Sequence, residues 1–108
     1  MRFHEQFEWD PMKARANLEK HAVSFEDAAE VLADVRGDQF HVEEYDDAHS
    51  MEEHRWITTA SHPYDRGIVL RIVWTSRTRG GSTVTRIIGA RSATRPERRI
   101  YEDEIASR

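Results

Sequence analysis

Residues 83–101, TVTRIIGARSATRPERRIY, decide the fold of this chain. The first half, from Val84 to Ala90, is rich in β-branched and apolar residues, which predicts a buried or half-buried strand. The second half begins like a helix. Thr94 can cap the first turn, Pro96 fits inside that turn, and Glu97 stands three residues after Thr94 as in a capping box. A strand is therefore expected to lead into a helix within a few residues.

Arginines gather at this strand–helix junction. They are Arg86, Arg91, Arg95, Arg98 and Arg99. A guanidinium group is planar, permanently charged and able to make two parallel hydrogen bonds to a phosphate, so the cluster predicts a polyanion as ligand. On a regular strand Arg86 and Arg91 would point to opposite faces. Both can face one site only if the strand bends, and Gly89 is where a bend is expected.

The charge is distributed unevenly along the chain. The net charge is −4, but residues 1–54 contain 5 Lys or Arg and 15 Asp or Glu (−10), whereas residues 55–108 contain 11 Arg and 5 Asp or Glu (+6). A local positive surface can attract a polyanion even when the total charge is negative. The alternative is that the two halves neutralise each other through ordinary surface ion pairs.

Length and composition favour a single small domain. We expect residues 1–108 to share one core, and the absence of cysteine excludes disulfides, thiolate metal sites and cysteine nucleophiles. No apolar run has the length of a signal or membrane-spanning segment, so a cytoplasmic protein is expected. The six histidines are scattered, with no pair four residues apart on one predicted helix. We therefore expect no metal ion and no other cofactor.

Two helices are expected near the N-terminus, after a short strand at residues 7–9. Asp10 is a favourable cap and Pro11 suits the first helical position, which predicts a helix that ends around His21. Ser24 can cap a second helix, which should end at Gly37-Asp38. Its apolar residues recur at helical spacing: Phe25, Ala28, Ala29 and Leu32.

Four strands are expected after these helices, at residues 40–45, 55–59, 68–75 and 84–90. Turns are expected at residues 62–67 and at Gly80-Gly81, and the acidic segment 46–53 is expected to be a mobile loop. The order β-α-α-β-β-β-β-α predicts an α+β fold, a small antiparallel sheet packed with two N-terminal helices and one C-terminal helix.

Three motifs accompany this order of elements. They are Phe7-Glu8-Trp9-Asp10 followed by Lys13, Asn17, Lys20-His21 and Val23-Ser24-Phe25; Glu53-x-Arg55-Trp56; and Arg86-Ile87-Ile88-Gly89-Ala90-Arg91 followed by Ala93-Thr94-x-x-Glu97-Arg98-x-x-Tyr101-Glu102. Together they cover about residues 7–102 and resemble the BrnT family of type II toxins. The chain departs from that pattern at Gly89, where serine is expected, and at Arg71 in a central strand.

The resemblance implies a RelE-like fold and an endoribonuclease that inhibits translation. It also implies a cognate BrnA-like antitoxin with a ribbon-helix-helix domain, bound in a toxin–antitoxin heterotetramer. Two other functions remain open on the residues alone. One is a non-catalytic RNA- or DNA-binding module, and the other is an interaction domain whose arginine-rich half binds an acidic protein.

Metal-independent RNA cleavage requires groups that move protons and stabilise charge while a ribose 2′-hydroxyl attacks the adjacent phosphate. The candidate catalytic residues are His21, Arg55, Arg86, Arg91 and Tyr101, and the candidate RNA-binding residues are Lys20, His54, Arg95, Arg98 and Arg99. His21 suits acid–base work because an imidazole titrates at about pH 6.5. Tyr101 could donate a proton or stack on a base. Each of them also has a structural alternative: in that alternative His21 only ends its helix, and Tyr101 only packs its helix onto the sheet.

Overall fold

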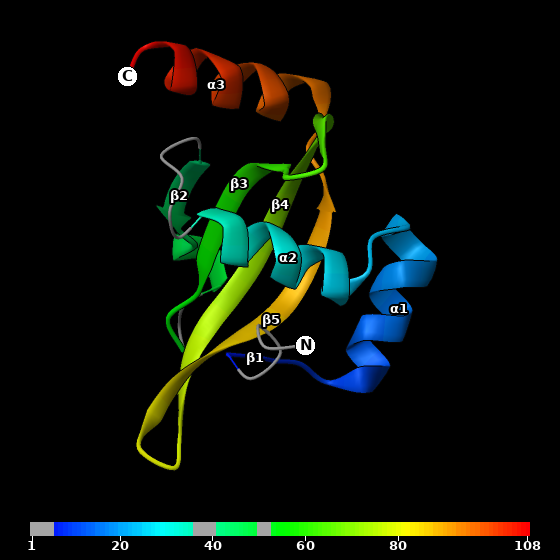
Figure 1. The fold of residues 1–108 in the computed structure, drawn as a ribbon, viewed down its shortest axis with the longest axis vertical. Coiled ribbons are helices and arrows are strands. Elements are labelled where there is room, and N and C mark those ends of the chain that lie inside the picture. Colours follow the sequence, from blue (N-terminus) through cyan, green and yellow to red (C-terminus); the bar gives the residue numbers. More distant parts are fainter. Residues whose placement is uncertain (1–5, 36–40, 50–52) are drawn as a thin grey trace.

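The computed structural model describes residues 6–35, 41–49 and 53–108 (Figure 1). In chain order the elements are β1 (Phe7–Glu8), α1 (Pro11–His21), α2 (Phe25–Val35), β2 (His41–Tyr45), the 3-10 turn η2 (Asp47–His49), β3 (Trp56–His62), β4 (Asp65–Arg79), β5 (Ser82–Ser92) and α3 (Arg95–Ala106). The fold is α+β, and the predicted order of helices and strands is confirmed. The predicted helix break at Gly37-Asp38 lies outside the described residues.

The strands form one sheet in the order β1-β5-β4-β3-β2. From β2 to β5 it is the predicted antiparallel meander, and β1 adds to its edge parallel to β5, with Glu8 opposite Arg86. The β4–β5 hairpin closes at Gly80 and Gly81, whose φ angles of +56° and +83° favour glycine.

Strands β4 and β5 are longer than predicted. The turn between β3 and β4 contains only Pro63 and Tyr64, because Asp65 already pairs with His62 across it. Residues 65–67, predicted as turn, therefore belong to β4. Arg55, predicted as the first residue of its strand, lies just before β3.

The core lies between the sheet and α2, which crosses one face of the sheet in Figure 1. The predicted apolar stripe of α2 is buried, and it packs against alternate residues of the central strands. These core residues are Phe25, Ala28, Ala29, Leu32, Ala60, Leu70, Ile72 and Ile87. Because side chains alternate along a strand, Arg71 and Val73 point to the opposite face.

A bulge in β5 brings the arginines of this strand to one face. Val73 pairs with Gly89 while the next residue of β4, Trp74, pairs with Ile87, so Ile88 is an extra residue in β5. The bulge reverses the alternation, and Arg86 and Arg91 both point away from α2. The predicted bend near Gly89 is confirmed.

The helix ends follow the predicted capping. The Asp10 carboxylate accepts the Met12 N–H at 2.8 Å, and Thr94 and Glu97 form a capping box at the start of α3. Ser24 Oγ accepts the Asp27 N–H at 3.0 Å at the start of α2. None of the helices in the described ranges is long and apolar enough to span a bilayer.

Candidate active site

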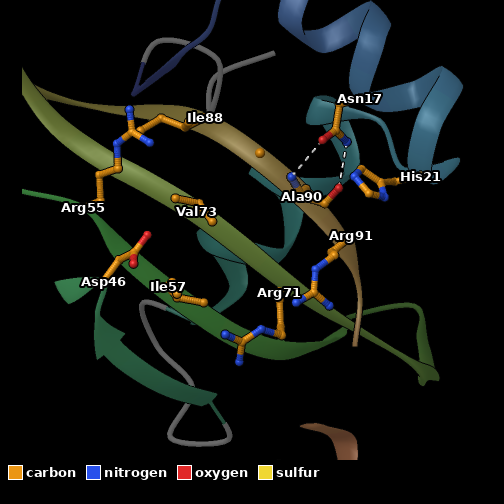
Figure 2. Close-up of a pocket in the computed structure, with 11 residues that line it drawn as sticks. Asn17, His21, Asp46, Arg55, Ile57, Arg71, Val73, Ile88, Ala90 and Arg91 are labelled. Carbon is orange, nitrogen blue, oxygen red and sulfur yellow. Dashed lines mark hydrogen bonds between the residues drawn. The ribbon is translucent and has the colours of Figure 1, made fainter. Parts of the chain in front are cut away.

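The face of the sheet opposite α2 carries a cleft of about 430 Å³ (Figure 2). The middle of the sheet forms its apolar floor, and polar side chains from α1, the loops and the strands form its rim. The lining residues are Asn17, His21, Asp46, Arg55, Ile57, Arg71, Val73, Ile88, Gly89, Ala90 and Arg91. The volume falls within the range of small-molecule sites, about 300–1,000 Å³.

Three of the predicted catalytic residues meet in this cleft. His21 comes from the last turn of α1, Arg55 from the residue just before β3 and Arg91 from the end of β5. A further arginine, Arg71, stands opposite Arg91 in the β4–β5 ladder. The sequence singled out Arg71 only as a departure from the family pattern, although its alternation with core residues Leu70 and Ile72 could have placed it on this face.

Asn17 fixes α1 against the edge of β5. Its side-chain amide donates to the carbonyl oxygens of Ala90 (2.7 Å) and Val23 (2.9 Å), and its Oδ1 accepts the Ala90 N–H (3.1 Å). The Asn17 amide thus pairs with both backbone groups of Ala90, as a neighbouring strand would (Figure 2). Asn17 and His21 are four residues apart and share one face of α1, so this contact also positions His21 at the cleft.

The guanidiniums at one end of the cleft bind a carboxylate of α3. Arg91 donates to both oxygens of Glu97, at 2.7 and 2.8 Å, and Arg71 Nε lies 3.3 Å from Glu97 Oε2. Arg71 also donates to Glu44 at 3.0 Å. The hydrogen bonds from Arg91, helped by Thr94 and the charge of Arg71, lower the pKa of Glu97 to about 2. The hydrogen bonds to Glu97 in turn raise the pKa of Arg91.

The other end of the cleft contains Arg55 and Asp46. The Asp46 side chain is buried, and its backbone N–H donates to the Arg55 carbonyl at 2.9 Å. Arg55 also contacts Glu53 at 3.3 Å. The sequence treated residues 46–53 as a mobile loop; instead residues 47–49 form η2, Asp46 lines the cleft, and residues 50–52 lie outside the described part of the chain. No periodicity in this acidic segment could have revealed Asp46.

Two predicted catalytic residues lie outside the cleft lining. Arg86 donates to Glu8 at 2.7 Å, and Glu8 also accepts two hydrogen bonds from Arg79. Burial alone would raise the pKa of Glu8, but these hydrogen bonds outweigh it and hold the pKa below its ordinary value. Tyr101 is the buried residue of α3, and its hydroxyl lies 3.1 Å from Ser61 Oγ, so this contact joins the helix to β3.

The predicted RNA-binding residues also lie beyond the lining. Lys20, Arg95 and Arg99 are exposed. His54 Nδ1 is hydrogen-bonded to the Tyr45 hydroxyl at 2.6 Å, and Arg98 donates to the Gly67 carbonyl at 2.6 Å and to Glu102 at 3.3 Å.

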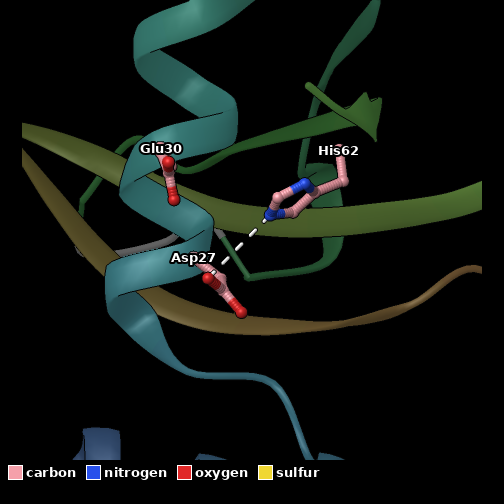
Figure 3. Close-up of side chains that lie close together, drawn as sticks. All are labelled: Asp27, Glu30 and His62. Carbon is pink, nitrogen blue, oxygen red and sulfur yellow. Dashed lines mark ion pairs between the residues drawn. The ribbon is translucent and has the colours of Figure 1, made fainter. Parts of the chain in front are cut away.

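One group of side chains in the described ranges has the composition of a metal site (Figure 3). Asp27, Glu30 and His62 place their ligand atoms within 4.8 Å of one another, a proximity that residue spacing in the sequence could not reveal. However, His62 Nδ1 accepts the Tyr64 N–H at 3.2 Å, so the proton of the neutral ring lies on Nε2, which points at Asp27. A metal-binding histidine needs the opposite arrangement, because its second nitrogen normally donates a hydrogen bond. The hydrogen bonding of His62 therefore does not fit a metal ion at this group.

Comparison with known proteins gives one family match. The model of a family described as "Ribonuclease toxin, BrnT, of type II toxin-antitoxin system" matches residues 9–97. No individual curated protein matches the chain. The matched segment contains every residue that lines the cleft, together with Glu97.

Proposed function

Because the chain belongs to the BrnT family of ribonuclease toxins of type II toxin–antitoxin systems, we propose that it cleaves RNA in this cleft without a metal ion. The observation that carries the proposal is that His21, Arg55, Arg71 and Arg91 line one cleft. These groups can transfer protons and stabilise phosphate charge without a cofactor.

The proposed reaction is an internal transfer of the phosphodiester. A base removes the proton of a ribose 2′-hydroxyl, the 2′-oxygen attacks the adjacent phosphorus, and the bond from phosphorus to the 5′-oxygen of the next nucleotide breaks. An acid then protonates the leaving 5′-oxygen. The products are a 2′,3′-cyclic phosphate and a 5′-hydroxyl end.

The residues of the cleft divide these tasks. His21 is proposed to act in proton transfer, since an imidazole can both accept and donate a proton near neutral pH. Arg55, Arg71 and Arg91 are proposed to bind the phosphate and stabilise its developing charge, the task for which fixed donors are most effective. Arg86 and Tyr101, which lie outside the lining, take no part in this mechanism. The exposed cations Lys20, Arg95 and Arg99 are proposed to contact the RNA backbone beyond the cleft.

The arginine–carboxylate pairs favour the alternative in which the two halves of the chain neutralise each other through surface ion pairs. Arg86 pairs with Glu8 of the acidic half, as that alternative expects, whereas Arg91 and Arg98 pair with Glu97 and Glu102 of the basic half itself. The presence of three guanidiniums and an imidazole in the lining of one cleft is not expected from that alternative alone, because paired surface arginines have no reason to share a cleft.

RNA degradation by the purified protein tests the proposal. Cleavage should persist in EDTA, should leave 2′,3′-cyclic phosphate ends, and should stop when every ribose carries a 2′-O-methyl group. His21→Gln should reduce the rate strongly, whereas His54→Gln, a histidine outside the cleft, should reduce it little. Intact RNA from a folded, partner-free protein would favour the binding module, and loss of cleavage in EDTA would overturn the metal-independent mechanism.

A type II system pairs its toxin with a protein antitoxin. We propose that the partner here is a BrnA-like protein with a ribbon-helix-helix domain, that the two form a heterotetramer, and that the free toxin stops translation in the cytoplasm. The family match supports this proposal. Co-expression of toxin and antitoxin followed by light scattering should give the mass of two copies of each, and a stable one-to-one complex would contradict it.

A further inference from the structure

Two of the cleft arginines share one internal carboxylate. Arg91 holds Glu97 through both terminal nitrogens, and Arg71 contacts the same carboxylate through Nε. This two-pronged geometry is the one that a guanidinium uses for a phosphate, whose oxygens have similar spacing and charge. Glu97 therefore uses the donors that a phosphate group would need.

The carboxylates also cancel the charge at this end of the cleft. Arg71 and Arg91 carry two positive charges, and Glu44 and Glu97, which bind them, carry two negative charges. Since the pKa of Glu97 is lowered to about 2, its carboxylate is ionised throughout the neutral range. In this state the guanidinium donors are already bonded to carboxylates, and the four groups together exert no net electrostatic attraction on a phosphate.

We propose that Glu97 occupies, in the free protein, a phosphate-binding subsite between Arg71 and Arg91, and that a phosphodiester group of single-stranded RNA binds there by displacing the Glu97 carboxylate. This inference rests on the proposed function, in which the cleft binds RNA. It assigns Glu97 the role of a positioning residue that holds both guanidiniums in place until the substrate arrives.

The exchange requires only a local movement. Glu97 Oε1 also accepts the Thr94 N–H at 2.8 Å, and the Glu97 N–H donates to Thr94 Oγ1 at 3.3 Å. These bonds belong to the cap of α3 rather than to the arginines. Rotation of the Glu97 side chain away from Arg71 and Arg91 also breaks the bond from the Thr94 N–H to Oε1. The bond from the Glu97 N–H to Thr94 Oγ1 does not involve the carboxylate, so it remains and holds the start of α3.

Glu97→Gln tests the displacement directly. Glutamine has nearly the same size and can replace glutamate in a capping box, so the helix start is retained while the competing charge is removed. Glu104→Gln is the matched control. It removes the same charge from the same helix, but Glu104 contacts Arg108 and not a cleft arginine. Glu97→Asp retains the charge in a shorter side chain.

The readout is the affinity for a fully 2′-O-methylated single-stranded RNA, measured by fluorescence anisotropy over a range of salt concentrations. Glu97→Gln should bind about tenfold more tightly at low salt, and the slope of log K against log salt should steepen by about 0.7, the value for one additional phosphate contact with a single strand. Glu104→Gln and Glu97→Asp should retain the wild-type slope. Circular dichroism confirms that all variants are folded.

The outcomes separate this inference from the proposed function. If the wild type binds RNA but Glu97→Gln binds equally or more weakly, Glu97 does not compete with phosphate and the inference is wrong. An equal gain in Glu104→Gln would assign the effect to total charge and would also overturn it. If none of the folded proteins binds RNA, the proposed function itself fails, and this inference fails with it.

Discussion

Replacement of Asn17 by alanine should destabilise the protein far more than a surface substitution on the same helix. The Asn17 side chain makes three hydrogen bonds to the backbone, two with Ala90 and one with Val23. Ala90 is buried, with 4% of its surface exposed, so its N–H and carbonyl groups would lose their partners in a place that water reaches poorly.

The size of the effect follows from these contacts. A hydrogen bond contributes about 0.5–1.5 kcal/mol net, and a buried group left unpaired adds to the loss. Three bonds to partly buried groups give a loss of about 2–3 kcal/mol. For a domain of this size that corresponds to a fall in Tm of about 10–20 °C.

Urea unfolding followed by circular dichroism measures the change, with Lys13→Ala on the exposed side of α1 as the control. The control should stay within about 0.5 kcal/mol of the wild type. Asn17→Asp refines the test, because aspartate retains the acceptor for the Ala90 N–H but places a carboxylate against two carbonyl oxygens. It should be no more stable than Asn17→Ala at pH 7. An Asn17→Asp protein as stable as the wild type would refute the bridging role of the amide.

Three further predictions follow from the same contacts. The pKa of Glu97 is lowered to about 2 in the folded state, so its ionisation stabilises the fold by about 3 kcal/mol above pH ~4.5, and this is lost as the pH falls toward 2. Urea unfolding should show that the gap in stability between the wild type and Glu97→Gln narrows from about 3 kcal/mol at pH 6 to about 1 kcal/mol at pH 2.5. A constant gap would contradict the ion pair. Arg91→Ala should lower kcat/KM for RNA cleavage by about 100-fold, because it removes a donor that stabilises the phosphate. Arg79→Ala is the control, since the ion pair of Arg79 with Glu8 is exposed, and its kcat/KM should stay within a factor of about three of the wild type. Equal losses in the two variants would show that the active site is not in the cleft. Gly80→Ala should cost about 1 kcal/mol of stability because Gly80 has a positive φ. Gly89→Ala should be tolerated, since its added Cβ would lie 3.9 Å from Asn17 Oδ1. Thermal unfolding should therefore give a lower Tm for Gly80→Ala than for Gly89→Ala.

Local signals in the sequence predicted most of the fold. The caps at Asp10, Ser24 and Thr94 and the turn at Gly80-Gly81 depend on residues that are adjacent in the chain, so their chemistry can be recognised without coordinates. The parallel pairing of β1 with β5 was not predicted. It joins segments more than seventy residues apart, and nothing in two residues of strand specifies the direction of pairing.

The site was harder to predict because it depends on contacts between distant segments. His21, Arg55 and Arg91 were chosen for their chemistry and do share a cleft, but Arg86 was chosen by the same reasoning and its guanidinium binds Glu8 at the edge of the sheet instead. The bulge at Ile88 brings Arg86 and Arg91 to one face without bringing them to one site. Arg86 lies opposite Glu8 of β1 and binds its carboxylate, whereas Arg91 lies further along β5, where it lines the cleft.

The charge asymmetry of the chain left open two interpretations, a polyanion site and mutual neutralisation, and the fold combines them. At the edge of the sheet, arginines of the basic half pair with carboxylates of the acidic half, as Arg79 and Arg86 do with Glu8. In the cleft, Arg71 and Arg91 are held by Glu44 and Glu97 on the surface where the phosphate is proposed to bind. Holding a long side chain in one conformation costs entropy that would otherwise oppose ligand binding. Carboxylates that hold the guanidiniums in advance therefore lower the entropy cost of binding RNA, while the competition between carboxylate and phosphate lowers the affinity.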